Sequence, residues 1–127
     1  MTGNRLRELI YTKLKTLDTQ QSPIDVFYLL ADEANMYPHI VFNLSRSAKY
    51  DFARDDITLD VDIYTKNDEV KAQDLADAVE TMFNNLNDPQ TYLLPTFFVE
   101  RITSVQDADK SIRHKSVEIT IQNYERS

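Results

Sequence analysis

The chain has 127 residues, of which 42% are hydrophobic and 28% charged, and it has no cysteine. This length and composition predict one soluble globular domain over residues 1–127, without disulfides or thiolate chemistry. The longest apolar runs are too short to span a membrane, and the N-terminus lacks the apolar stretch of a secretion signal. The net charge of −7 disfavours tight binding to nucleic acid, because DNA is itself densely anionic.

The residue types that common enzyme sites require are scarce in this chain. A dinucleotide-binding loop or a P-loop needs at least two glycines, and only Gly3 is present. The two histidines, His39 and His114, cannot supply a three-histidine zinc site, and neither lies in a recognisable catalytic setting. We therefore expect no enzymatic activity, no cofactor and no metal, and a structural or exposed role for both histidines.

Helical spacing of leucine and isoleucine predicts a first amphipathic helix over residues 4–17. Two short strands are expected next, over residues 24–31 and 39–45. The polar segment 46–56 has no clear pattern, which indicates a loop. The stretch 57–65 (ITLDVDIYT) alternates cleanly between apolar and polar residues and predicts the clearest strand of the chain.

A long helix is predicted over residues 66–88, with Asp68 as its N-cap. Its expected apolar stripe consists of Val70, Leu75, Ala76, Val79, Met82, Phe83 and Leu86. Residues 88–95 form a predicted loop with apolar side chains, and residues 96–105 and 112–125 are expected to pair as an antiparallel hairpin.

Strands with one apolar face need a single covering layer. The predicted fold class is therefore α+β, an antiparallel or mixed β-sheet with two main helices packed on one face. The other face is expected to be polar and to carry Thr58, Asp60, Asp62, Tyr64, Glu118, Thr120, Gln122 and Tyr124.

The paired aspartates of the clearest strand have two interpretations. Asp60 and Asp62 are two residues apart, so on a strand they project from the same face. They could bind Mg²⁺ together with substrate phosphates, but such a site needs a base and a cationic side chain, and none is visible nearby in sequence. The simpler reading is a solvated sheet face, although two aspartates in one strand suggest a use for negative charge.

The order of elements resembles the tail terminator, or tail-completion, proteins of long-tailed phages, the minor tail protein U-like group. The resemblance covers nearly the whole chain. It lies in the first amphipathic helix, the Tyr37-Pro38 pair before a strand, the Ile63-Tyr64-Thr65 turn into the long helix, and the final strand pair.

This resemblance implies a structural protein of the virion tail that assembles in the host cytoplasm. It implies a hexameric ring on the head-proximal end of the tail tube, which stops tube polymerisation and joins the head. The expected partners are other copies of the chain, the tail tube protein, head–tail connector proteins, and DNA that passes without tight binding. Alternatives are a head-completion or neck protein, a Mg²⁺-dependent enzyme using Asp60 and Asp62, and a small binding domain without catalysis.

Two sets of candidate site residues follow from the proposed ring. Asp60, Asp62 and Glu118 are predicted to face the lumen or a seam between subunits. The two loops are predicted to contact the tube, the connector or a neighbouring subunit, through Tyr50, Phe52, Arg54, Tyr92, Leu93 and Leu94.

Overall fold

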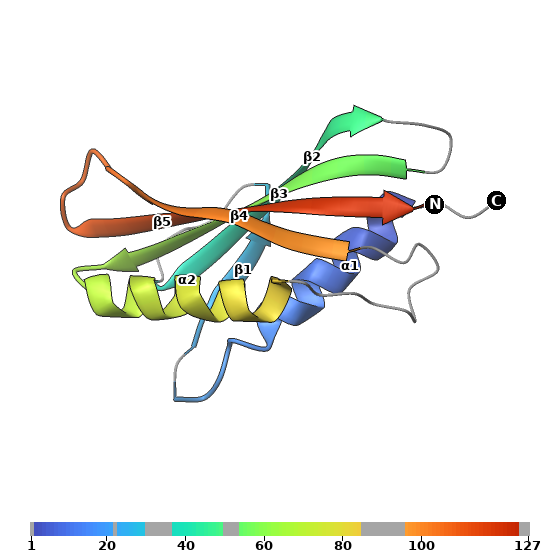
Figure 1. Ribbon diagram of the computed structural model, residues 1–127. Coiled ribbons are helices and arrows are strands. Elements are labelled where there is room, and N and C mark those ends of the chain that lie inside the picture. The colour runs from blue at the N-terminus through green and yellow to red at the C-terminus, as the bar shows by residue number, and fades with distance from the viewer. Residues whose placement is uncertain (1, 22, 30–36, 50–53, 85–95, 125–127) are drawn as a thin grey trace.

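The computed structural model describes the chain except for residues 1, 22, 30–36, 50–53, 85–95 and 125–127. The described elements are two helices and five strands (Figure 1). In chain order they are α1 (Thr2–Lys15), β1 (Asp25–Tyr28), β2 (His39–Lys49), β3 (Arg54–Lys66), α2 (Glu69–Phe83), β4 (Thr96–Val105) and β5 (Ile112–Tyr124).

The five strands form one sheet in the order β1-β2-β3-β5-β4. β1 pairs with β2 in parallel, and the other three pairs are antiparallel, so the sheet is mixed. The predicted hairpin of β4 and β5 is confirmed. Strand β3 lies at the centre, between β2 and β5, and β1 and β4 are the two edges of the sheet.

Both helices lie on the same side of the sheet, which confirms the predicted α+β fold class (Figure 1). Alternate residues of the strands point toward the helices and are fully buried, as the period of two requires. The core consists of Leu6, Ile10 and Leu14 from α1, Leu75, Ala76, Val79 and Phe83 from α2, and Ile40, Phe42, Leu59, Val61, Ile63, Phe97, Val117, Ile119 and Ile121 from the sheet, with Ile24 and Val26. No described helix is long and apolar enough to cross a membrane.

The central strands are longer than the sequence predicts, and the expected loop 46–56 is correspondingly shorter. β2 continues to Lys49 and β3 begins at Arg54, with Lys49 paired to Asp55. A register shift between Arg46 and Ala48 allows this extension, because a bulge keeps two strands paired where their side-chain alternation does not match. The loop prediction was wrong because hydrogen bonds between the two backbones keep these polar residues in strands. Such pairing leaves no alternation of apolar residues in the sequence.

The first strand, by contrast, is shorter than predicted. β1 ends at Tyr28, and the next residue, Leu29, has φ 73° and leaves the extended region. Leu29 is also 53% exposed, so it does not continue the buried pattern of the strand. The run of apolar residues over 24–31 therefore predicted a longer strand than the structure has.

Helix α2 has the predicted N-cap, but it begins at Glu69 and ends at Phe83, inside the predicted range 66–88. The Asp68 side chain accepts a hydrogen bond of 2.9 Å from the backbone N–H of Lys71, which confirms the N-cap. Val70 was assigned wrongly to the apolar stripe: it is 72% exposed, and Ala72 is buried instead. The structure places the C-cap at Asn84, and Leu86 lies outside the described residues.

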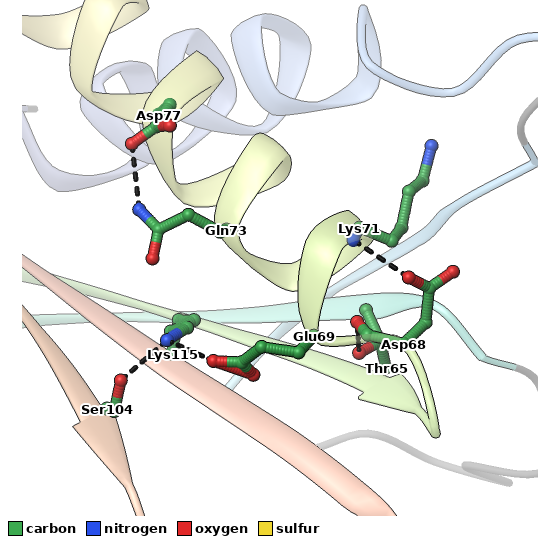
Figure 2. A network of polar contacts seen from close by, with 8 residues as sticks. All are labelled: Thr65, Asp68, Glu69, Lys71, Gln73, Asp77, Ser104 and Lys115. Carbon is green, nitrogen blue, oxygen red and sulfur yellow. Dashed lines mark hydrogen bonds and ion pairs between the residues drawn. The ribbon is translucent and has the colours of Figure 1, made fainter.

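A buried lysine joins the start of α2 to the β4–β5 hairpin (Figure 2). Lys115 of β5 is 5% exposed, and its Nζ lies 2.7 Å from Oε1 of Glu69 and 2.6 Å from Oγ of Ser104. Because Glu69 belongs to α2 and Ser104 to β4, these contacts show that this flank of α2 faces the β4 edge of the sheet.

Candidate assembly surface on the uncovered sheet face

The face of the sheet opposite the helices carries the predicted acidic residues. Asp60 and Asp62 both project from this face of β3, as their spacing predicts, since Leu59, Val61 and Ile63 between and beside them are buried against the helices. Asp60 lies directly opposite Glu118 of β5 on one side. The structure therefore brings the three predicted lumen or seam residues into one group.

This acidic group includes a carboxylate whose charge is disfavoured. The pKa of Asp60 is raised above its ordinary value of 3.8, first by burial and then by the nearby charges of Asp62 and Glu118. The positive charge of Arg101 acts in the opposite direction. The like charges of Asp62 and Glu118 next to Asp60 therefore destabilise the folded chain.

Glu118 has a cationic partner on the edge strand. The Nη2 atom of Arg101 lies 3.1 Å from Oε2 and 3.3 Å from Oε1 of Glu118. Arg101 reaches this face because a register shift between Val99 and Arg101 reverses the alternation of β4. Simple alternation would have placed Arg101 on the helix side together with Val99, so sequence reasoning missed it.

Asp62 also has a partner that lies far away in sequence. Its Oδ1 atom is 2.8 Å from Nε2 of His114, which comes from β5. His114 pairs in register with Tyr64, so the contact with Asp62 is diagonal across the two strands. Strand pairing thus brings His114 and Arg101 to the acidic group, although neither lies near Asp60 and Asp62 in sequence.

A row of rings covers one end of the same face. The ring of Tyr64 stacks on His114 at 4.2 Å and on His39 at 4.9 Å, and Tyr37 lies 4.9 Å from His39. Phe27 of β1 adds an edge-on contact to His39 at 6.1 Å. These ring contacts leave His39 only 3% exposed, although neither described helix covers it.

The other predicted site residues are placed as follows. Tyr50, Phe52, Tyr92, Leu93 and Leu94 lie outside the described residues, and their predicted interface role stays a prediction. Arg54 is the first residue of β3 and pairs in register with Tyr124, so it belongs to a strand and not to the predicted loop.

The site residues that sequence reasoning missed are His114, Arg101 and the ring row. One signal was available: Glu118 lies four positions after His114 in an alternating strand, so the two share a face. No comparable signal identified Arg101 or the pairing of Asp62 with His114, which depend on strand order and on the bulge in β4.

The chemistry available to this surface is that of partnered charges on an open sheet. Among the described residues, no group of three or more histidine, aspartate or glutamate side chains is arranged to hold a metal ion. A cavity of about 640 Å³ beside the β4–β5 turn is lined by His114 and Lys115, and its lining does not include Asp60, Asp62 or Glu118. The acidic group can repel an anionic polymer and can form charged contacts with a protein surface.

Comparisons with known proteins give a likeness of fold. No protein-family model and no curated protein matches the sequence. Among solved structures, the chain is similar to a chain in the structure titled "Virion of native gene transfer agent (GTA) particle". The TM-score is 0.69 at 10% sequence identity, and the similarity covers 91% of each chain, so this mixed sheet with its two helices is a fold that also occurs in that particle.

Proposed function

We propose that this chain is a structural component of a phage-like virion. The observation that carries the proposal is the fold likeness to a chain of the gene transfer agent particle, with a TM-score of 0.69 over 91% of both chains. Because the similarity covers 91% of both chains, it involves the whole domain and not a single common motif. The order of elements that resembles phage tail-completion proteins is a second and separate reason.

Within the virion, we propose that the chain forms a ring at the head-proximal end of the tail tube. There it ends tube polymerisation and offers a surface to the head–tail connector. The role requires no reaction, and we propose that Asp60 and Asp62 act through their charge and not as catalytic groups. The contacts of Asp62 with His114 and of Glu118 with Arg101 support this, since they use the side chains for structural pairing.

The uncovered face is suited to line or border a DNA passage. A channel wall must let DNA move, so it should repel phosphate and not bind it. Asp60, Asp62 and Glu118 supply negative charge on this face; Arg101 forms an ion pair with Glu118, and the imidazole of His114 contacts Asp62. Salt screens such repulsion beyond roughly 8 Å at physiological ionic strength, so it acts only close to the wall.

The test is electron microscopy of particles produced with and without this chain. If the chain is a tail terminator, we expect overlong or irregular tails when it is absent. Tails of uniform length should return when the chain is supplied. Tails of normal length that fail to join heads would instead assign the chain to the neck or to head completion. Particles unchanged by the loss of the chain would contradict both roles.

The charge of the face is tested separately with the double variant Asp60→Lys and Asp62→Lys. We expect impaired DNA passage or impaired ring assembly, because a basic wall binds phosphate. If infectivity and ring formation were unchanged, Asp60 and Asp62 would not lie at the lumen or at a seam between subunits. Thr58→Lys, on the same face of the same strand, serves as a control that adds charge without removing the two carboxylates.

A further inference from the structure

The two helices of the helix layer carry opposite charge. Helix α1 contains Arg5, Arg7, Lys13 and Lys15 against a single acidic residue, Glu8. Helix α2 contains Glu69, Asp74, Asp77 and Glu80 against a single basic residue, Lys71. In a chain with a net charge of −7, the concentration of positive charge in one helix sets that helix apart from the rest of the surface.

The contacts of α1 show which of its flanks faces outward. The guanidinium of Arg7 lies over the ring of Tyr28 in β1 at 5.0 Å, and Nζ of Lys15 donates to the carbonyl oxygen of Ile24, just before β1. Tyr11, one turn from each of these basic residues, is 41% exposed. The flank formed by Arg7, Tyr11 and Lys15, here called the basic flank, therefore lies above the β1 edge of the sheet.

The basic flank borders an apolar groove. Its volume is about 350 Å³, and Arg7, Glu8, Tyr11, Thr12, Tyr28 and Phe42 line it. An apolar centre with charged residues at its rim is the common composition of a protein–protein contact. The groove lies between α1 and the strands at the β1 end of the sheet.

The contacts of α2 place its acidic flank at the other end. Glu69 reaches Lys115, whose Nζ also contacts Ser104 of β4 (Figure 2). Glu80 lies 11 residues after Glu69, about three helical turns, so it projects from the same side of α2. The flank formed by Glu69 and Glu80, here called the acidic flank, lies above the β4 edge, where Val99 and Ile102 are only partly buried.

We propose that the acidic flank and β4 edge of one copy dock against the basic flank and β1 edge of the next copy. This inference rests on the proposed ring and names the surfaces that close it. A head-to-tail interface needs two different patches that complement each other on one molecule, and a ring results when the rotation between copies closes. Opposite edges of one sheet that carry opposite charge meet this requirement, and charge complementarity also fixes the orientation of docking.

Charge reversal tests the pairing of the two flanks. In Glu80→Lys, a lysine of one copy meets the basic flank of the next copy. In Arg7→Glu, a glutamate meets the acidic flank of the neighbouring copy. Because like charges repel, each variant alone should reduce ring incorporation at least about tenfold. When both variants are produced together, an alternating ring places the two substituted side chains, which again have opposite charge, against each other at one interface. The next interface pairs the native Glu80 with the native Arg7. We therefore expect assembly to return to near the wild-type level in the mixture, and also in the single chain that carries both changes.

The matched control is Asp74→Lys, which makes the same change in charge on α2. Asp74 and Asp77 line a groove with Lys13 of the same chain, between the two helices, so both lie away from the proposed interface. Asp74→Lys should leave assembly within about twofold of wild type. Thermal unfolding of each purified variant establishes that a loss of assembly is not a loss of folding.

Crosslinking provides a second readout, because the chain has no cysteine of its own. We expect Tyr11→Cys and Glu80→Cys, combined in one chain and treated with a short bis-maleimide on assembled tails, to give a ladder that ends at the closed ring. Each single variant should give no dimer, and a mixture of the two should stop at dimers. Dimers of Glu80→Cys alone, or charge variants that assemble like wild type, would overturn the proposed interface.

The two proposals fail in different ways. If tails are unaffected by loss of the chain, the terminator role is wrong whatever the flanks do. If tails depend on the chain but neither the mixture nor the double variant restores assembly, the ring stands and the pairing of the two flanks is wrong.

Discussion

The substitution Asp60→Asn should stabilise the protein at neutral pH, although it removes a charge from a polar surface. Burial and the charges of Asp62 and Glu118 raise the pKa of Asp60, so its ionised form is less favourable in the folded than in the unfolded chain. Asparagine keeps the shape of the side chain and is as poor a strand former as aspartate, so strand propensity does not change the comparison.

The size of the effect follows from the cross-strand geometry. Asp60 is directly opposite Glu118, and such a like-charge pair costs about 0.2–1 kcal/mol relative to a neutral pair. Because the folded pKa is raised, the penalty is present above that pKa, decreases as the pH falls through it, and is absent well below the unfolded value of 3.8. The gain in the free energy of unfolding should therefore be seen at pH 7 and disappear in acid.

Urea unfolding of the wild type and the variant at both pH values measures this difference. Asp62→Asn is the matched control, because Oδ1 of Asp62 lies 2.8 Å from Nε2 of His114, and its loss should destabilise the chain by about 0.5–1.5 kcal/mol. If Asp60→Asn destabilised the protein at pH 7, or if its gain persisted undiminished in acid, the charge argument for this face would be refuted.

Three further predictions concern the helix layer and its anchoring. Asp68→Ala should lower the free energy of unfolding by about 1 kcal/mol in urea titrations, because the backbone N–H of Lys71 loses its acceptor; an unchanged midpoint would contradict this cap. Phe83→Ala should cost about 3–5 kcal/mol because the ring is fully buried, whereas Val70→Ala, at a position 72% exposed, should change stability by less than about 0.5 kcal/mol by the same measurement. Lys115→Ala should cost about 1–3 kcal/mol and increase amide exchange at the start of α2, since it leaves Ser104 without this contact; unaltered exchange would argue against an anchoring role.

The sequence by itself determined which side of β3, of β5 and of both helices is buried. Alternation in residues 57–65 and 112–125 separated the core residues from the polar face, and the 3.6-residue spacing did the same for both helices. The Asp68 cap was also readable, because an N-cap interaction spans only three residues. Val70 shows the limit of such reasoning: at the edge of an apolar stripe, the direction in which the helix docks decides which residue is buried.

Only the tertiary structure decided which charged residues meet. Strand order places β5 beside β3, so His114 reaches Asp62 across 52 residues of sequence, and a register shift in β4 turns Arg101 toward Glu118. The same pairing buries Lys115 between α2 and β4. Periodicity is a local property that fixes the face of a strand, whereas its neighbours and register depend on packing between distant segments, so the partners of these charges could not be read from the sequence.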